Sequence, residues 1–188
     1  PHADYRKLLV APHTMRKRFV ELIRREADHA AEDRVSGIRA KMNQLQDPEL
    51  IRELCRASQA GVPISLNIRG LCCLRPGVPG LSESIRVFSV LGRFLEHGRI
   101  YGFENDGSPE YYFGSADWMK RNLDRRVETI APVTEPTLIA EVEEILTIAE
   151  NDNHSAWDLK PDGSYIRRRP SDGEEPRPSQ QEFMKIVR

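Results

Sequence analysis

The sequence lacks the features that mark several common classes of protein. None of its apolar runs approaches the roughly 20 residues that a membrane-spanning helix needs. The first residues, PHADYRKLLV, contain no hydrophobic region of a secretory signal. A glycine-rich loop of the Walker type is also absent, which excludes a P-loop kinase. We therefore expect a cytoplasmic protein, and we leave open a peripheral position at the inner face of the membrane.

Cysteine is scarce, and its placement argues against a disulfide framework or a metal cluster. The three cysteines, Cys55, Cys72 and Cys73, form no metal-ligand pattern. Because Cys72 and Cys73 are adjacent, their side chains point to opposite sides of an extended segment, which disfavours a bond between them. We expect reduced, buried thiols of the kind found in cytosolic proteins.

Neither sign of charge is in large excess, since the net charge is −1 at pH 7. The balance varies along the chain: residues 1–60 carry twelve Lys or Arg against nine Asp or Glu, whereas residues 132–188 carry seven against twelve. A strongly basic nucleic-acid binder is therefore excluded as a first interpretation, and we expect no nucleic-acid partner. Arginines gathered in one place can still attract an anionic ligand.

The composition of the chain suits one folded unit. Its 188 residues, 30% charged and 39% hydrophobic, fit a single domain or a domain with a tail. We place the main domain at residues 1–152. Residues 153–188 form a C-terminal extension with a short helix, which belongs to the same domain or is a tail. The chain opens with Pro1, so we expect a part of a longer protein or a processed product.

Strand-like and helix-like segments alternate through the first 70 residues. This order predicts an α/β fold with a mixed, largely parallel sheet flanked by helices. The expected elements are strands at residues 5–10, 38–42 and 62–68, a helix from Thr14 to about Ala31, and a helix that Asp47 caps, with Pro48 at its first position and Gly61 after its end.

The rest of the chain continues with short β-prone runs and two further helices. The run 85–91 is rich in β-formers, although its spacing also allows a short helix. A helix over 135–150 is predicted to present one apolar face, formed by Leu138, Val142, Ile145, Leu146 and Ala149. The other expected elements are strands at 99–104, 110–114, 126–132 and 165–169, a helical turn or two at 116–122, and a short helix over 179–187.

His97 is the best single catalytic candidate. It lies in GRFLEHGRIYGF (Gly92–Phe103), two residues before Arg99 and just ahead of an alternating run. Histidine can exchange protons near neutral pH or attack phosphorus directly, and a nearby guanidinium can pair with phosphate oxygens. Taken alone, a His-x-Arg triplet also fits a histidine with a purely structural role.

Two further segments place suitable side chains at the ends of expected strands. Arg69 follows one strand and opens a loop rich in glycine and proline, where ligands bind in open α/β sheets. Its guanidinium matches phosphate bidentately, although an arginine in this position, taken alone, is more often a surface or salt-bridge residue. In GSADW, Ser115 and Asp117 offer a hydroxyl and a carboxylate, and either one could instead cap a helix.

Taken together, these motifs resemble one known family. IRGLCCLRPGVPGLSESIRV, followed by GRFLEHGRIYGFEN and GSADWMKRNLDRRVE, closely resembles the C-terminal part of the long, multidomain polyphosphate kinases. YRKLLVAP and KMNQLQDPELI in front of them, and AWDLKPDGSY behind them, also fit. The resemblance covers nearly the whole chain.

The resemblance implies an activity and a fold. The family reversibly transfers the terminal phosphoryl group of ATP to inorganic polyphosphate, with Mg2+ and through a phosphohistidine. The C-terminal half of such enzymes looks like two facing phospholipase-D-like domains, each of which supplies one histidine. This chain looks like the second of these domains. The phosphorylated histidine would belong to the preceding domain, whose motif is absent here.

The resemblance also implies roles for single residues. His97 stands at the position of the family's second histidine, and Arg69 at that of an arginine on the nucleotide phosphates. Arg99 takes the place of the lysine in the phospholipase D superfamily, and Ser115 would line the pocket. The magnesium ligands and the contacts to the ATP base would lie outside this chain. We therefore expect the chain to be inactive without the N-terminal domains, and the intact enzyme to be a homo-oligomer.

Two alternatives from other classes remain open. The first is a phosphodiesterase or nuclease of the phospholipase D type, which needs two His-x-Lys motifs, whereas this chain has one such site with arginine in the place of lysine. The second is a non-catalytic module that binds polyphosphate or nucleotide.

Overall fold

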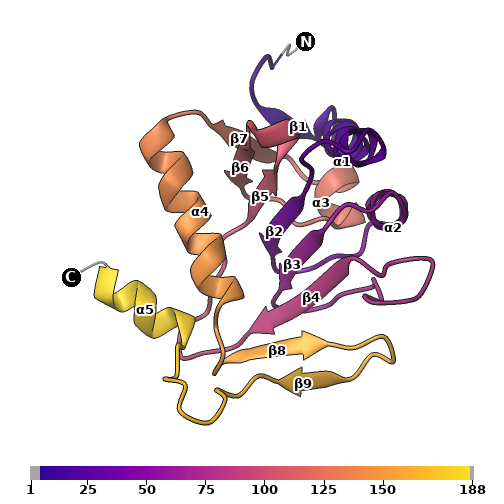
Figure 1. Cartoon of the computed structure of the whole chain (residues 1–188). Helices are drawn as coiled ribbons and strands as arrows, with labels where there is room; N and C mark the ends of the chain where they lie inside the picture. Colours follow the sequence, from indigo (N-terminus) through magenta and orange to yellow (C-terminus); the bar gives the residue numbers. More distant parts are fainter. Residues whose placement is uncertain (1–4, 187–188) are drawn as a thin grey trace.

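Helices cover both faces of one central sheet (Figure 1). The structure is a computed structural model that describes residues 5–186. The helices are α1 (Met15–Ala31), α2 (Pro48–Gln59), α3 (Lys120–Arg125), α4 (Pro136–Glu150) and α5 (Ser179–Ile186), with a 3-10 turn η1 (Asn105–Gly107). The strands are β1 (Leu9–Ala11), β2 (Ile38–Met42), β3 (Ile64–Ile68), β4 (Ile85–Val90), β5 (Ile100–Phe103), β6 (Glu110–Gly114), β7 (Glu128–Val133), β8 (Ala156–Leu159) and β9 (Tyr165–Arg167).

The strands within residues 5–186 form a nine-stranded sheet in the order β1-β7-β6-β5-β2-β3-β4-β8-β9. The expected mixed sheet flanked by helices is confirmed. The expectation that it is largely parallel is wrong, because only β2, β3 and β4 pair in parallel. The other neighbours are antiparallel. Short turns join β5 to β6 and β8 to β9, and a short turn can connect only antiparallel strands.

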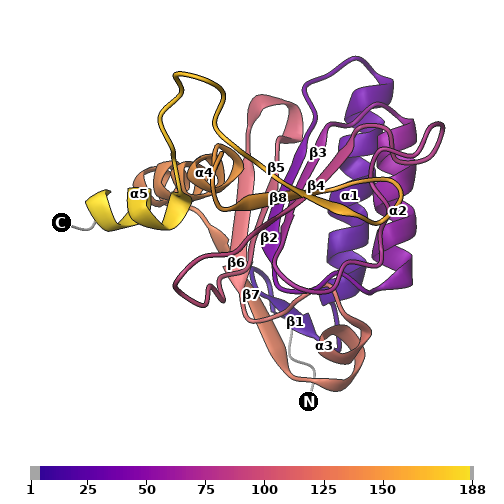
Figure 2. The same ribbon diagram turned by 90° about the horizontal axis from the view of Figure 1, so that it is seen from below.

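Helices α1 and α2 lie side by side on one face of the sheet (Figure 2). Helical spacing on α1 buries Phe19, Leu22 and Ile23, and α2 buries Leu50 and Leu54 against the same core. As predicted, Asp47 caps α2: its Oδ1 accepts the backbone N–H groups of Glu49 and Leu50, both at 3.1 Å. The main hydrophobic core lies between these two helices and the central strands of the sheet.

Helix α4 covers the opposite face of the sheet less completely. Leu146 and Ala149 are buried there, whereas Leu138 is 48% exposed. The predicted apolar face therefore packs fully only toward the C-terminal end of the helix. An ion pair helps to join α4 to the sheet, since Arg39 of β2 donates from Nε and Nη2 to Glu150 at 3.2 and 3.0 Å.

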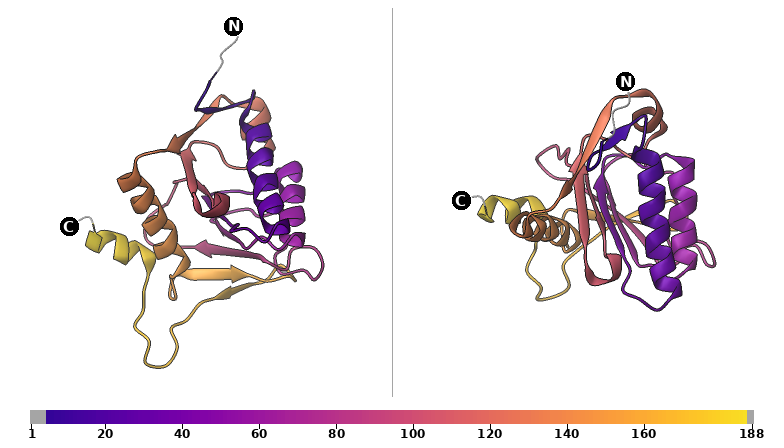
Figure 3. Two further views of the ribbon diagram at one scale, coloured as in Figure 1. Left: turned by 45° about the horizontal axis from the view of Figure 1, so that its top comes forward. Right: turned by 90° about the horizontal axis from the view of Figure 1, so that it is seen from above.

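Residues after α4 extend the sheet before the chain reaches α5. Strand β8 pairs with β4, with Phe88 opposite Asp158, and β9 pairs with β8. Helix α5 then lies beside α4 (Figure 3). The division at residue 152 stays a prediction, and the predicted end of the last helix at Val187 lies outside the described residues. None of the helices in the described part of the chain is long and apolar enough to cross a membrane.

Local boundaries differ most from the expected ones in two places, and strand β8 was not among the expected elements. The first strand is Leu9–Ala11 rather than residues 5–10, and it pairs with β7 at the edge of the sheet. The helical turn expected over 116–122 begins later, at Lys120. The segment before α3 is held outside a helix because Tyr101 donates its hydroxyl to the Ala116 carbonyl at 2.6 Å, and the Tyr101 ring stacks on Trp118.

Candidate functional site

Four strand ends meet at one end of the central sheet. Asn43 follows β2 and Arg69 follows β3, and the two residues are neighbours because these strands are parallel. The pairing extends one residue beyond β3, since the Arg69 N–H donates to the Met42 carbonyl at 3.2 Å. Strand β5 runs antiparallel to β2, so the residues just before it, His97 and Arg99, reach the same end. Asp117 follows β6, whose end lies beside the start of β5.

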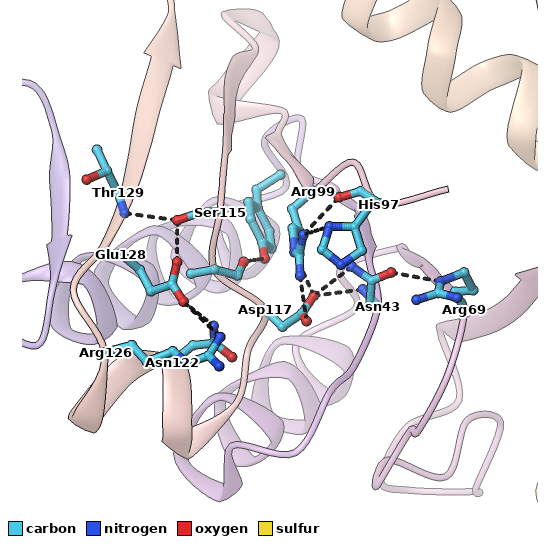
Figure 4. Close-up of polar contacts among 12 residues, drawn as sticks. Asn43, Arg69, His97, Arg99, Ser115, Asp117, Asn122, Arg126, Glu128 and Thr129 are labelled. Atoms are coloured by element: carbon cyan, nitrogen blue, oxygen red, sulfur yellow. Dashed lines mark hydrogen bonds and ion pairs between the residues drawn. The ribbon is translucent and has the colours of Figure 1, made fainter. Parts of the chain in front are cut away.

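Asp117 lies at the centre of this group (Figure 4). Arg99 donates to it through two parallel bonds, Nε to Oδ1 and Nη2 to Oδ2, both 3.1 Å. The Asn43 backbone N–H donates to the same Oδ1 at 2.7 Å. The side chains of Arg99 and Asp117 are only 10% and 6% exposed, so water screens the pair weakly. The carboxylate thereby holds the guanidinium in one orientation.

Arg99 in turn orients His97. Its Nη1 lies 2.7 Å from His97 Nδ1 and 2.9 Å from the His97 carbonyl oxygen. A guanidinium has donors only, so Nδ1 must accept, and the imidazole carries its proton on Nε2. His97 is therefore presented as a donor through Nε2–H, on an exposed residue.

Arg69 is bonded to the protein through Nε, and its two terminal guanidinium nitrogens remain available. Its Nε donates to Asn43 Oδ1 at 2.8 Å, and its carbonyl accepts the Ser89 hydroxyl at 3.1 Å. Among the described residues, no carboxylate pairs with Arg69 and no protein group accepts from its two terminal nitrogens. A guanidinium placed this way can still bind an oxyanion with two parallel bonds.

Ser115 lies in a separate group of polar contacts. Its hydroxyl donates to Glu128 Oε2 and accepts the Thr129 N–H at 3.2 Å. The other Glu128 oxygen accepts Asn122 Nδ2 at 2.6 Å, and Arg126 lies 3.8 Å away. Figure 4 shows this group beside the Asp117 group without a bond between them. The structure thus brings His97, Arg99 and Arg69 together and gives Ser115 different partners.

Asn43 and Glu128 take part in these contacts but were not among the candidates predicted from the sequence. Asn43 follows directly on an expected strand, so its place at a strand end was a usable signal. Glu128 lies inside β7 and had no comparable signal, because a carboxylate in a short strand usually faces solvent. Within residues 5–186, no three His, Cys, Asp or Glu side chains gather in a way that could hold a metal ion.

The sheet, with its helical layers, defines the class of fold. It is similar to a phospholipase D family member, Nuc from Salmonella typhimurium, with a TM-score of 0.58 and 15% identity over 82% of this chain and 97% of that one. NucT from Helicobacter pylori has a TM-score of 0.51 at 12% identity. The chain therefore has the phospholipase-D-like fold.

Its family follows from closer similarities. A family model described as polyphosphate kinase C-terminal domain 2 matches residues 8–180. The chain belongs to this family. It is 59% identical over 171 residues to a polyphosphate kinase of Thermosynechococcus vestitus and 56% identical over 180 residues to one of Synechocystis.

The relatives are much longer than this chain. The matches cover 91% and 96% of this chain but only 23% and 25% of the two cyanobacterial proteins. The crystal structure of polyphosphate kinase from Porphyromonas gingivalis superposes with a TM-score of 0.93 at 41% identity, covering 97% of this chain and 28% of that one. The chain thus spans about a quarter of the length of its relatives.

Proposed function

We propose that this chain supplies half of the active site of an ATP–polyphosphate phosphotransferase, which catalyses ATP + polyP(n) = ADP + polyP(n+1) reversibly. One observation supports this proposal most strongly: His97, Arg99 and Arg69 converge at one end of the sheet in a chain of the polyphosphate kinase family. Such a group can donate hydrogen bonds to phosphate oxygens and balance their charge, which phosphoryl transfer requires.

In the proposed reaction, a histidine of the preceding domain attacks the γ-phosphorus, the bond to the β-phosphate oxygen breaks, and ADP leaves. The phosphoryl group then passes from that histidine to the end of polyphosphate. The Nε2–H of His97 hydrogen-bonds the transferring group or the leaving oxygen and keeps its proton, because Nδ1 carries none and loss of the only ring proton would leave an imidazolate. Arg69 binds phosphate oxygens through its two terminal nitrogens.

The contacts suggest a more limited part for Arg99 and for Ser115. Arg99 already donates to Asp117 and His97 through four bonds, so only one of its five N–H groups remains for phosphate. We propose that it chiefly orients His97 and adds positive charge. Ser115 is exposed, and its hydroxyl donates to Glu128. Its proposed role is therefore limited to lining the phosphate-binding site.

Several requirements would be met outside this chain. Mg2+, which would neutralise charge on the transferring phosphates, is proposed to bind residues of the other domains. ATP or ADP and polyphosphate are the proposed small-molecule partners. The intact enzyme is proposed to be a homo-oligomer in the cytoplasm, in contact with the inner membrane face or free of it. The chain alone is proposed to be inactive.

The test uses a full-length polyphosphate kinase that carries this chain as its C-terminal domain. With γ-labelled ATP and Mg2+, the wild type should form labelled polyphosphate, and His97→Ala should lower turnover about 100-fold or more with the fold unchanged. Acid-labile, base-stable label should appear on the upstream domain in the wild type. Wild-type turnover in His97→Ala would contradict the role of His97. Label on this chain that disappears in His97→Ala would make His97 the nucleophile.

The likeness to the Salmonella protein favours one second candidate, phosphodiester hydrolysis. The same full-length enzyme should therefore be tested with bis(p-nitrophenyl) phosphate. We expect no hydrolysis, because the site has Arg99 where the superfamily's lysine would stand. Hydrolysis that His97→Ala abolishes, without polyphosphate synthesis, would replace the proposed function with a phosphodiesterase.

A further inference from the structure

The loop that carries His97 has little support of its own. Residues 91–98 connect β4 to β5 without regular structure, and Phe94 and Leu95 are 51% and 77% exposed. Within the described part of the chain, no backbone N–H or carbonyl group of residues 92–98 is hydrogen-bonded to another backbone group. A segment of this kind is mobile unless side chains fix it.

One side chain from the far end of the chain supplies such a contact. Gln180, in the first turn of α5, accepts the Phe94 N–H with its Oε1 at 2.9 Å and donates from Nε2 to the Phe94 carbonyl at 2.8 Å. Both backbone groups of Phe94 are thus bound by one amide. The same Nε2 also donates to Glu96 Oε1 at 3.0 Å. Glu96 immediately precedes His97.

Gly92 makes room for this amide. A Cβ built on Gly92 would overlap Oε1 and Cδ of Gln180. Since this Gly92 has no unusual φ, the need for glycine comes from the close approach of the amide and not from backbone strain. The overlap involves the end of a flexible side chain, so a methyl group at Gly92 would displace Gln180 without disturbing the sheet.

Both partners of this contact are themselves anchored. Asp152 is fully buried, and its Oδ2 accepts the Ser179 N–H at 2.8 Å, which fixes the start of α5. On the loop side, Glu96 Oε2 pairs with Lys41 Nζ at 2.8 Å, and the Lys41 side chain is only 10% exposed. The contact therefore connects a fixed helix end to a fixed strand.

We propose that Gln180 is a positioning residue for His97, which holds the 91–98 loop through Phe94 and Glu96. This inference rests on the proposed function of His97. Gln180 does not contact the reacting atoms in this scheme. It acts by lowering the mobility of the segment that presents the imidazole, because a misplacement of about 1 Å can cost up to about 100-fold in rate.

The first test measures the loop directly. In the full-length enzyme, hydrogen exchange of peptides spanning residues 91–99 should be faster in Gln180→Ala than in the wild type. Gln181→Ala is the matched control, because it removes the same amide one residue further along α5, where the exposed side chain makes no hydrogen bond within residues 5–186. Unchanged exchange in Gln180→Ala would overturn the proposal.

The second test measures turnover. Gln180→Ala should lower kcat about tenfold while KM for ATP and the melting temperature stay near the wild-type values, since an interaction that matters for the transition state lowers kcat and kcat/KM together. Gln181→Ala should behave as the wild type. Faster loop exchange with an unchanged kcat, or an equal loss in Gln181→Ala, would overturn the positioning role.

A double-mutant cycle tests the same contact by another route. Gly92→Ala should reproduce the loss of kcat and the faster exchange because it displaces the amide. In the Gln180→Ala background the same methyl group has space, so Gly92→Ala should add no further effect. Additive losses would overturn the proposal. If the wild type formed no polyphosphate, the proposed function would fail, whereas the exchange results would still report whether Gln180 holds the loop.

Discussion

At the residue scale, the site depends on one carboxylate. Asp117 fixes Arg99 by two bonds, and Arg99 determines which nitrogen of His97 carries the proton. His97, Arg99 and Arg69 could be predicted as candidates because each stands beside a β-prone run. Asn43 also follows an expected strand, but its bond to Arg69 could not be predicted. The two residues are 26 apart in the sequence, and only the parallel pairing of β2 with β3 brings them together.

Asp117→Asn should destabilise the chain and disorder the site. The amide can still accept the Asn43 N–H, but it leaves the nearly buried Arg99 without a countercharge. Removing one partner of a buried ion pair costs about 3 kcal/mol in the free energy of unfolding. Urea unfolding measures this loss, and Asp172→Asn, which changes an exposed loop carboxylate, serves as the control. A loss no larger than in the control would mean that water replaces the carboxylate at little cost.

At the element scale, sequence patterns predicted the helices and caps that residues close together in the sequence determine. The helices α1 and α2 followed from apolar spacing and from the Asp47 cap. The partial exposure of α4 could not be predicted, because its hydrophobic spacing is regular and only the position of the sheet decides which turns are buried. The antiparallel pairing of β1 with β7 joins residues far apart in the chain, such as Leu9 and Ile130.

Asp47 performs two tasks that substitutions should separate. It caps α2, and its Oδ2 also accepts from Arg16 at 2.9 and 3.2 Å. Asp47→Asn keeps an acceptor for the cap, whereas Asp47→Ala loses both contacts. We expect the free energy of unfolding to fall by about 1 kcal/mol more in the alanine variant, which is the usual value of an N-cap. Arg52→Ala, at an exposed position of the same helix, is the control in thermal unfolding; equal losses in the two Asp47 variants would argue against the cap.

The attachment of α5 should depend on pH through Asp152. Burial alone would raise the pKa of this carboxyl, but backbone N–H groups of Ser179, Ser155 and His154 hold the pKa below its ordinary value of 3.8. Because the folded-state pKa is depressed, the contribution to stability is complete above 3.8 and is lost as the pH falls through the folded-state value.

A comparison of Asp152→Asn with the wild type over pH checks this sign. The difference in free energy of unfolding should be largest near neutral pH and should shrink in acid, where the wild-type carboxylate is protonated as well. Urea unfolding at several pH values measures it. Asp172, which is exposed in a loop, provides the control substitution Asp172→Asn. A difference that grows in acid would contradict the depressed pKa.

At the scale of the whole molecule, alternation of strands and helices predicted the class of fold but not the order of the sheet. The alternation of strands and helices correctly predicted parallel pairing only for the central strands β2, β3 and β4. Hairpins add antiparallel strands on both sides, and their turn residues, such as Asn105 and Gly107, show only that the chain reverses. Which edge receives each hairpin is a matter of tertiary packing, which short-range patterns do not contain.

Removal of residues 153–188 should damage the sheet. Strand β8 covers the edge of β4, and Arg168 lies over the Phe88 ring at 4.8 Å. Deleting the segment would expose an unpaired edge strand, which promotes association between chains. We expect a lower melting temperature and higher-order species in size-exclusion chromatography. Deletion of residues 171–188 is the control for association, since it removes α5 but keeps β8, β9 and Arg168. A stable monomer of residues 1–152 would make the remainder a tail.

The bond from Arg99 to His97 Nδ1 limits the paths open to a proton. Because the Arg99 guanidinium neither accepts nor releases a proton, no relay through it can exchange a proton with His97 Nδ1. His97 therefore keeps its single ring proton on Nε2 and presents one fixed hydrogen-bond donor to an oxyanion. If one site serves both synthesis and breakdown of the polymer, both directions of the reaction would meet this same donor, without a change of tautomer between them.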